Sequence, residues 1–358
     1  MELAELVALR PRPGAGLLLG LTRRCPLRCA HCSTSSTMAG EQPAADQLLR
    51  FARSFTADDR PEVLLLTGGE PLLRPRLVAG LTAVARSAGC RTALLSGMFF
   101  ARGGRVPAPV MRVLAGLDHF SASLDAFHER EVPRADVLRA VRRVLDAGVP
   151  VSFHLTGSGP ADPYLAEVTA DIRRAFADRV PMLVNQVRPV GRAASWATAT
   201  TTAAGPRADT DRVRPCAMAA WPVVAFDGTV LACCNQQTVD QRPAPRHLTL
   251  GHIARDDWPA VRARSSASPV LRLIRSTGPD HLYARYGAPA APGYCAGCRQ
   301  LGDRPELLSG ADRDGAGPVG ELLDRTAARL QVEAGPVALM RRHGCPPYAD
   351  LVALGGRP

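Results

Sequence analysis

The chain has 358 residues, 46% of them hydrophobic, which is enough for a large core and a second module, and no apolar stretch approaches the ~18 residues that cross a membrane. Its ten cysteines, without the basic start and long apolar run of a secretory signal, argue against a disulfide-bonded secreted protein. They predict a cytoplasmic protein that uses cysteine for metal or redox chemistry. The net charge of +11 comes from arginine alone, because the sequence has no lysine. These arginines do not interleave with aromatic residues as they do on a nucleic-acid-binding surface. We therefore expect no nucleic acid as partner, and no membrane either.

Short apolar runs alternate with amphipathic segments over residues 14–192. Six runs have the length and composition of buried strands: Gly14–Thr22, Glu62–Leu66, Arg91–Ser96, His119–Leu124, Pro150–Leu155 and Met182–Val187. Five segments between them have helical spacing of apolar residues: Ala44–Phe55, Pro75–Ala88, Pro107–Leu117, Arg134–Ala147 and Pro163–Phe176. A full eight-unit barrel needs ~250 residues. The pattern therefore predicts an α/β fold, a partial (β/α)6 TIM-like barrel, followed by a small cysteine-rich hairpin-plus-helix module.

Three cysteines, Cys25, Cys29 and Cys32, follow the first predicted strand with the spacing C-x3-C-x2-C. A [4Fe–4S] cluster has four irons and normally takes four cysteines, so three thiolates leave one iron open to a substrate or cofactor. The alternative is a zinc-binding knuckle completed by His31. Structural zinc usually takes paired C-x2-C units, however, and His31 would strain the loop if it reached the same ion.

The second predicted strand leads into the run Gly68-Gly69-Glu70. Together with the cysteine triplet, this run resembles the motifs of the radical S-adenosylmethionine (radical SAM) superfamily. The resemblance implies a [4Fe–4S] cluster coordinated by the three cysteines plus S-adenosylmethionine. It also implies that His31, at a position that is aromatic in the family, lies next to the cofactor, and that Gly68, Gly69 and Glu70 receive its methionine amino group.

Active sites of parallel barrels gather at the carboxyl ends of the strands, so the residues there are the further candidates. For cofactor binding these are Gly97, Ser121, Ser123, Asp125, His154 and Val190. Asp125 and His128 are candidate catalytic residues because histidine titrates near neutrality, although a surface loop is the plainer interpretation of His128. For substrate contact we expect Met98, Phe99, Asn185, Gln186 and Arg188. The run that begins at Met98 suits a substrate wall and a piece of core equally well.

A linker is predicted over 193–211, rich in Ala, Thr and Pro, between the barrel and a module over 212–300. Asp227-Gly228 between two apolar runs predicts a hairpin. Four cysteines of the module can close around one cluster: Cys216, Cys233, Cys295 and Cys298. The spacing resembles the SPASM and twitch modules, and one auxiliary [4Fe–4S] cluster is the better fit. Three alternatives stay open: Cys234 in place of Cys233, a further site at Cys345, and a zinc ribbon.

Two segments flank these units, a lead-in over 1–13 and a helical extension over 301–358. The extension contains a predicted helix, Val319–Val332, with Leu322, Leu323 and Leu330 on one side. We expect this segment to cap or pack against the rest of the chain.

The family resemblance implies an oxidoreductase that cleaves S-adenosylmethionine reductively, abstracts a substrate hydrogen and oxidises the substrate through the auxiliary cluster. A flavodoxin- or ferredoxin-type protein would donate the electron. The favoured substrate is a ribosomally made peptide, and a small natural product such as an amino sugar is the alternative. Only about two dozen residues precede Cys25, which is too few for a leader-peptide-binding domain and weakens the peptide case. A non-catalytic iron–sulfur carrier is the alternative of another class.

Overall fold

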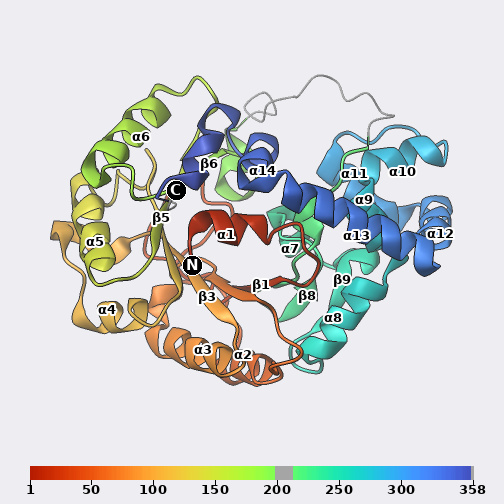
Figure 1. Ribbon diagram of the computed structural model, residues 1–358, viewed down its shortest axis with the longest axis horizontal. Coiled ribbons are helices and arrows are strands. Elements are labelled where there is room, and N and C mark those ends of the chain that lie inside the picture. The colour runs from red at the N-terminus through yellow and green to blue at the C-terminus, as the bar shows by residue number, and fades with distance from the viewer. Residues whose placement is uncertain (198–212, 356–358) are drawn as a thin grey trace.

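The computed structural model describes residues 1–197 and 213–355. Its nine strands in the described residues form one sheet in the order β6-β5-β4-β3-β2-β1-β7-β8-β9 (Figure 1). The strands are β1 Gly16–Gly20, β2 Val63–Thr67, β3 Arg91–Ser96, β4 His119–Ser123, β5 Val151–Gly157, β6 Met182–Gln186, β7 Val223–Val224, β8 Thr229–Leu231 and β9 Thr249–His252. Strands β1 to β6 pair in parallel, each with the next along the chain. The predicted α/β fold with a partial parallel barrel is confirmed.

Helices cover the outer face of these parallel strands. They are α2 Ala45–Ala52, α3 Pro75–Ser87, α4 Ala108–Leu114, α5 Arg134–Asp146 and α6 Pro163–Phe176. Each lies within a few residues of its predicted range, because the apolar stripe of each sequence segment must face the sheet. In α5, for example, Val137, Val141 and Val144 are buried.

Successive residues of each strand face opposite sides of the sheet. In β1, Leu17 and Leu19 are fully buried under the helices, whereas Leu18 faces the interior of the barrel, where it lines a cavity. Leu65 of β2 pairs with Leu18 in register and lines the same cavity. The barrel interior therefore has apolar walls before any functional group is added.

The sheet continues beyond β1 into the cysteine-rich part of the chain. Strand β7 pairs with β1 in parallel and with β8 in antiparallel, and β9 adds to β8. The β7–β8 turn contains Asp227, which accepts a hydrogen bond from the Thr229 backbone at 3.0 Å, and Gly228, whose φ of 91° favours glycine. The predicted hairpin is confirmed. The predicted linker over 193–211 lies outside the described residues except for 193–197, of which 193–195 end the 3₁₀ helix η3 Gly191–Ser195.

Further helices follow the sheet. They are α7 Gln236–Asp240, α8 Trp258–Ala267, α9 Pro269–Ser276, α10 Pro279–Arg285, α11 Tyr294–Gln300, α12 Pro305–Asp314, α13 Gly317–Glu333 and α14 Gly335–His343. A short helix α1 Leu3–Ala8 precedes the sheet, and the 3₁₀ helix η7 Pro346–Ala353 ends the described chain.

The two ends of the chain meet beside β6. Leu3 and Val7 of α1 pack with Leu339 and Met340 of α14 in one buried cluster, and α1 and α14 lie side by side in Figure 1. The backbone N–H of Cys345 donates to the carbonyl of Val184 in β6 at 2.9 Å. The open edge of the partial barrel is therefore covered by segments from both chain ends, which also become part of the wall of the cavity.

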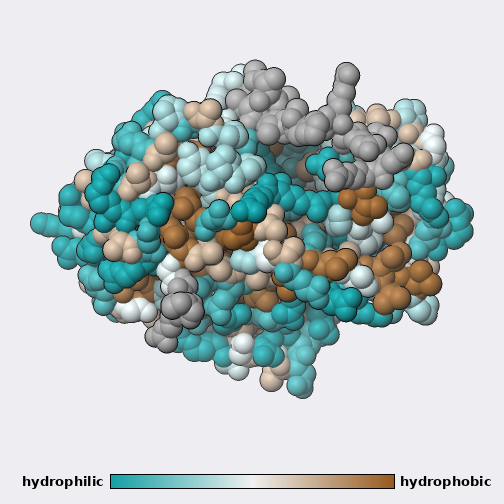
Figure 2. Space-filling model, turned by 45° about the horizontal axis from the view of Figure 1, so that its top comes forward, coloured by the Kyte–Doolittle hydropathy of each residue, from teal (hydrophilic) through white to brown (hydrophobic). Residues whose placement is uncertain are grey.

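Helix α13 presents its leucines to solvent. Leu322, Leu323 and Leu330 lie on one side as predicted, but this side is exposed, at 58%, 43% and 56% respectively. The buried side consists of small and charged residues, and Asp324 forms an ion pair with the buried Arg275 at 2.6 Å. Hydrophobic side chains gather on the right of Figure 2, the side on which α13 lies in Figure 1.

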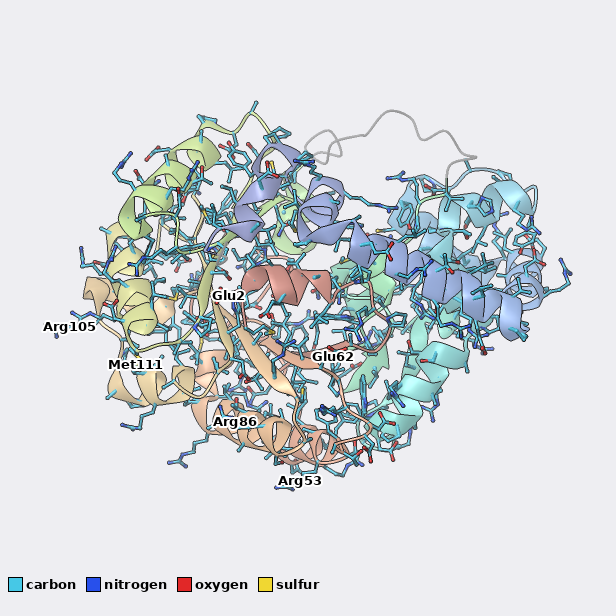
Figure 3. The ribbon with its side chains drawn as sticks, in the orientation of Figure 1. Glu2, Arg53, Glu62, Arg86, Arg105 and Met111 are labelled. Atoms are coloured by element: carbon cyan, nitrogen blue, oxygen red, sulfur yellow. The ribbon has the colours of Figure 1, made fainter. Side chains whose placement is uncertain are left out.

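The surplus positive charge is largely solvated. Arg53, Arg86 and Arg105 are exposed and lie at the periphery of the fold (Figure 3). Within the part of the chain that the structure describes, no helix has the length and hydropathy needed to cross a bilayer.

Candidate active site

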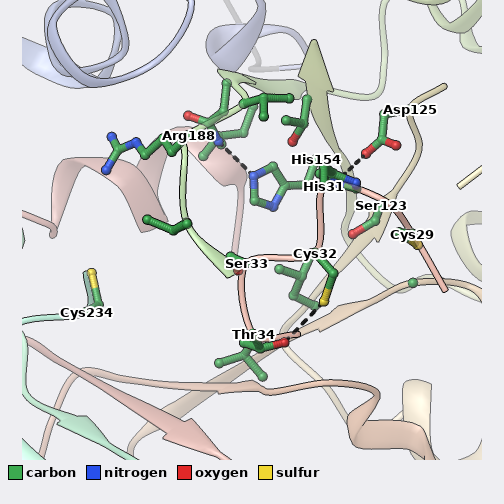
Figure 4. Close-up of a pocket in the computed structure, with 18 of the residues that line it drawn as sticks. Cys29, His31, Cys32, Ser33, Thr34, Ser123, Asp125, His154, Arg188 and Cys234 are labelled. Atoms are coloured by element: carbon green, nitrogen blue, oxygen red, sulfur yellow. Dashed lines mark hydrogen bonds and ion pairs between the residues drawn. The ribbon is translucent and has the colours of Figure 1, made fainter. Parts of the chain in front are cut away.

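A cavity of about 540 Å³ lies inside the barrel and opens among the loops that follow the strands. The loop after β1 contributes Cys25, Cys29 and Cys32 to its lining, and Figure 4 shows Cys29, His31 and Cys32 on that loop. The other walls come from the ends of β2 to β6, from α1 and α14, and from the start of the cysteine-rich module. Its volume is in the range of small-molecule sites.

The three cysteines of the loop have different environments. Burial raises the pKa of Cys25 to about 12. Burial acts in the same direction on Cys32, but the hydroxyl of Thr34, 3.3 Å from its sulfur, the Ser36 backbone and the charge of Arg192 together lower its pKa. A thiolate is the form that ligates iron, so the loop already favours it at Cys32.

The Gly-Gly run packs directly against the cysteine loop. The Gly69 N–H donates to the Thr22 carbonyl at 2.6 Å, and the Glu70 N–H donates to the Arg24 carbonyl at 2.8 Å. A Cβ on Gly69 would lie 2.4 Å from that same Arg24 oxygen. Glycine is therefore required here for the approach of two loops, and both Gly68 and Gly69 line the cavity.

Glu70 itself is turned inward. It is fully buried and accepts hydrogen bonds from the Leu72 N–H, the Ser96 hydroxyl and the Gly97 N–H at 2.9–3.1 Å. Burial raises its pKa to about 7. It ties the β2 loop to the β3 loop and does not contribute to the cavity lining.

Gly191 and Arg192 close the cysteine loop from the other side. Arg192 donates to the Cys29 carbonyl from Nε at 2.9 Å and to the Ser36 carbonyl from Nη1 at 2.7 Å. A Cβ on Gly191 would lie 2.3 Å from the Cys32 carbonyl oxygen, and φ at Gly191 is 57°. Sequence reasoning missed Arg192 as a site residue; its place directly after a glycine that follows a strand was the available signal.

A buried carboxylate lies between two histidines at the end of β4. Asp125 is 1% exposed, and its Oδ2 lies 2.8 Å from Nδ1 of His128 and 3.3 Å from Nε2 of His31. Burial alone would raise the pKa of Asp125, but His128 and His31 lower it. The ring of His31 also stacks on Phe127 with centroids 4.5 Å apart. His128 is thus a member of a buried cluster rather than a surface loop residue.

On the neighbouring strands, His154 and Asn185 form a neutral pair. The Asn185 Nδ2 donates to Nε2 of His154 at 2.7 Å, as the dashed line in Figure 4 marks. Burial lowers the pKa of His154 to about 4. The pair lines the cavity and offers hydrogen bonds without adding charge.

The structure brings most of the predicted site residues to one cavity. Those that line it are Cys25, Cys29, His31, Cys32, Gly68, Gly69, Gly97, Ser123, Asp125, His128, His154, Asn185, Gln186, Arg188 and Val190. Four other candidates from the barrel do not line it, nor do the four cysteines predicted for the second cluster. Glu70 is internal, Ser121 hydrogen-bonds with Ser152 at 2.7 Å, Met98 is fully buried in the core and Phe99 packs against the core.

A second group of cysteines lies beside the β7–β8 hairpin. It comprises Cys216 before the 3₁₀ helix η4 Ala217–Ala219, Cys233 after β8, and Cys295 and Cys298 on α11. Burial raises the pKa of Cys298 well above its ordinary value, and the nearby Cys233, Cys216 and Cys295 raise it further. The four predicted thiols thus come together from distant parts of the sequence.

The two remaining candidates of this region differ in their surroundings. Cys234 lies close to the group of four: burial and then its proximity raise the pKa of Cys216, Cys233 and Cys295. Cys234 lines the barrel cavity, and its sulfur accepts a hydrogen bond from Nη2 of Arg10 at 3.1 Å. Cys345 is buried against β6, where Gln186 hydrogen-bonds to it.

The chemistry of the donors bears on which metal group suits each cysteine set. The three cysteines on the loop after β1 and the four of the second group are all free thiols. Iron–sulfur clusters are held by cysteine thiolates, so both sets offer suitable donors. In the described residues, His31, Asp125 and His128 form a separate group of possible ligands whose atoms lie within 4.8 Å of one another.

Residues 19–170, less than half of the chain, match the sequence model of the Radical SAM superfamily. Similar curated proteins include a GTP 3′,8-cyclase of Synechococcus sp. (strain CC9605), 33% identical over 181 residues, which are 47% of this chain and 51% of that protein. A PqqA peptide cyclase of Ruegeria pomeroyi is 39% identical over 117 residues, 32% of this chain and 29% of that protein. The matched segment thus spans about half or less of these relatives.

Among solved structures, the S-adenosylmethionine-bound SuiB of Streptococcus suis aligns with a TM-score of 0.51 over 76% of this chain and 75% of that one. At 13% identity this likeness concerns the fold alone. It agrees with the partial barrel described above.

Proposed function

We propose that the protein is a radical SAM oxidoreductase that modifies a peptide. When bound, the first cluster and S-adenosylmethionine supply a 5′-deoxyadenosyl radical that removes a substrate hydrogen, and a second cluster supplies an acceptor for the electron left on the substrate. Cys25, Cys29 and Cys32 would hold the first cluster. All three line the cavity, so the cofactor that such a cluster would bind has room there.

The residues around the cavity would orient the cofactor and exclude water. The backbones of Gly68 and Gly69 line the cavity and would receive its methionine end, and the imidazole of His31 offers a flat surface beside the cluster loop. Asp125 keeps both neighbouring histidines in place through its 2.8 Å and 3.3 Å contacts. His154, held neutral by burial, contributes a hydrogen bond without a charge that would oppose a cationic sulfonium.

One observation carries the proposal of a net oxidation. The same cavity is lined by the first cysteine loop and by Cys234, the chain neighbour of Cys233. A cluster held by Cys216, Cys233, Cys295 and Cys298 would therefore lie just behind the cavity wall. With four cysteine ligands it has no open iron, which suits electron transfer.

A peptide is favoured over a nucleotide by the character of the walls. Leucines from β1, β2, β3 and β6 and Met340 of α14 line the cavity and suit apolar side chains better than a polyphosphate. The relatives include both a peptide cyclase and a nucleotide cyclase by name, so the sequence comparisons favour neither.

The decisive experiment is anaerobic reconstitution with iron and sulfide, followed by S-adenosylmethionine and dithionite. We expect 5′-deoxyadenosine by mass spectrometry, its loss in Cys29→Ala, and, with a co-encoded peptide, a product two hydrogens lighter. A product at the oxidation level of the substrate would contradict the role given to the second cluster, and no deoxyadenosine at all would point to an iron–sulfur carrier.

A further inference from the structure

The wall of the cavity formed by the two chain ends is positively charged. Arg10, which follows α1, and Arg188, which follows β6, line it beside the neutral imidazole of His343 in α14. Figure 4 shows the guanidinium of Arg188 directed away from Cys29 and His31, toward the side on which Cys234 lies. Since Arg10 contacts the sulfur of Cys234, the two arginines share that side of the cavity.

The polar atoms of these three side chains have few hydrogen-bond partners within the described residues. Nη2 of Arg10 donates to the Met218 carbonyl at 3.3 Å and to Cys234, whereas its Nη1 is buried without a partner. Arg188 makes one long contact, 3.5 Å, to the backbone carbonyl of His343. Nε2 of His343 is likewise buried without a partner.

No nearby acid balances the charge of Arg10 and Arg188. Among the described residues that line the cavity, Asp125 is the one carboxylate, and it is held between His31 and His128. The pKa of His343 is lowered to about 4 by burial and then by the charges of four nearby arginines, Arg342, Arg188, Arg10 and Arg214. Arg214 has an acidic neighbour, Asp280, at 3.6 Å.

The guanidinium carbon of Arg10 lies 4.7 Å from the centroid of the Trp221 ring, but its buried Nη1 has no hydrogen-bond partner in the described part of the chain. Such an unpaired atom is costly, and an incoming anion would remove that cost. Arg188 is exposed at the cavity and forms no ion pair within the described residues. Arginine matches carboxylate in particular because its planar fork donates two parallel hydrogen bonds. The wall beside the arginines is apolar: Leu6, Val7, Leu183, Met218, Leu339 and Met340. This combination fits an apolar ligand that bears one acid group.

We propose that Arg10 and Arg188 bind a carboxylate of the substrate, so that the substrate is an apolar peptide segment carrying an acidic side chain or its own free C-terminus. The inference rests on the proposed function, since it assigns the substrate class of the same cavity. Anchoring the carboxylate on this wall places the neighbouring apolar residue between the first cysteine loop and Cys234.

The test measures binding rather than turnover. The cluster-loaded protein, with S-adenosylmethionine and without reductant, is titrated by calorimetry with capped tripeptides, acetyl-Leu-Leu-Glu-amide against acetyl-Leu-Leu-Gln-amide. A second pair, acetyl-Leu-Leu-Leu with a free or an amidated C-terminus, distinguishes the two sources of the carboxylate. We expect one acidic member to bind about tenfold or more tightly than its neutral partner, as charge-assisted hydrogen bonds imply.

Variants assign that preference to the arginines. Arg10→Gln and Arg188→Gln should each bring the ratio of the affinities for the acidic and the neutral tripeptide closer to one. Arg188→Lys should retain part of the preference for the acidic tripeptide. Arg325→Gln, at a side chain 69% exposed on α13, is the matched control and should leave it intact. Binding of S-adenosylmethionine by each variant shows that the site is folded.

Equal affinity for acidic and neutral tripeptides in the wild type would overturn the proposal, as would a preference that survives both glutamine variants. Tighter binding of acetyl-Leu-Leu-phosphoserine-amide or of GTP than of every carboxylate peptide would also overturn it. These outcomes are separate from failure of the proposed function, which is judged by deoxyadenosine formation without any peptide.

Discussion

The Arg192 side chain donates a hydrogen bond to the Cys29 carbonyl at 2.9 Å, joining the segment after β6 to the loop after β1. Its second bond, to the Ser36 carbonyl, spans the same loop. The cysteine loop contains no helix or strand in the structure, so its shape depends on such contacts from outside.

Arg192→Ala should therefore loosen the first cluster site. A hydrogen bond from a charged donor contributes about 1.5–3 kcal/mol, so we expect affinity for S-adenosylmethionine to fall about tenfold or more, with lower iron content. Equilibrium binding and iron analysis on anaerobically purified protein measure both. Arg174→Ala, at a side chain 76% exposed on α6, is the control. Unchanged affinity in Arg192→Ala would show that the loop holds its shape unaided.

Gly69→Ala tests the packing of the Gly-Gly run against the cysteine loop. The added Cβ would lie 2.4 Å from the Arg24 carbonyl oxygen and 2.8 Å from the Ser36 hydroxyl, so the loops must separate. We expect a loss of about 1–3 kcal/mol in the free energy of unfolding and reduced iron at the first site. Gly159→Ala, whose Cβ would meet nothing within 4 Å, should be neutral. Denaturant unfolding compares the two variants.

Cys233→Ala and Cys234→Ala separate two adjacent thiols. The first should lose about four irons per chain. The second should retain them, because the sulfur of Cys234, although close to Cys216 and Cys295, lines the cavity and accepts a hydrogen bond from Arg10. Iron and sulfide analysis with electron paramagnetic resonance of the reduced protein would report the loss. Equal iron content in both variants, or loss in Cys234→Ala alone, would reverse the ligand assignment.

His119 should make the stability of the protein depend on pH. Burial lowers its pKa to about 4, from 6.5 in the unfolded chain. The unfolded state then binds more protons between these values, so stability present above pH 6.5 is lost as the pH falls toward 4. From pH 7 to 5.5 we expect His119 to account for about 1 kcal/mol. Denaturant titrations at both pH values measure the free energy of unfolding. In His119→Gln, the loss of this free energy between pH 7 and 5.5 should be smaller by that amount. An equal loss in wild type and variant would mean that His119 titrates alike in the folded and unfolded states.

The sequence anticipated the local elements well because each is encoded within its own segment. The apolar stripe of α5 and the Asp227-Gly228 turn of the hairpin are properties of neighbouring residues, and both formed where expected. The position of the cysteine triplet and the Gly-Gly run at the site was equally predictable, because the strands of a parallel barrel all end at the same mouth.

Side-chain direction was harder to foresee. Ser121 and Ser123 were both candidates for cofactor binding, but Ser123 lines the cavity whereas Ser121 hydrogen-bonds with Ser152 and does not. Met98 adopts a left-handed backbone, φ 62°, and turns into the core. Glu70 keeps its carboxylate on Ser96 and Gly97, two residues of another loop.

By itself, then, the sequence determined which segments become strands and helices and which thiols are offered to metal, because those properties depend on short-range pattern. Only the tertiary structure decided that Arg10 and His343, 333 positions apart in the chain, line the same cavity, and that Cys234 faces it. The physical reason is that a partial barrel leaves an open edge beside β6, and burying that edge draws the two chain ends together over the site.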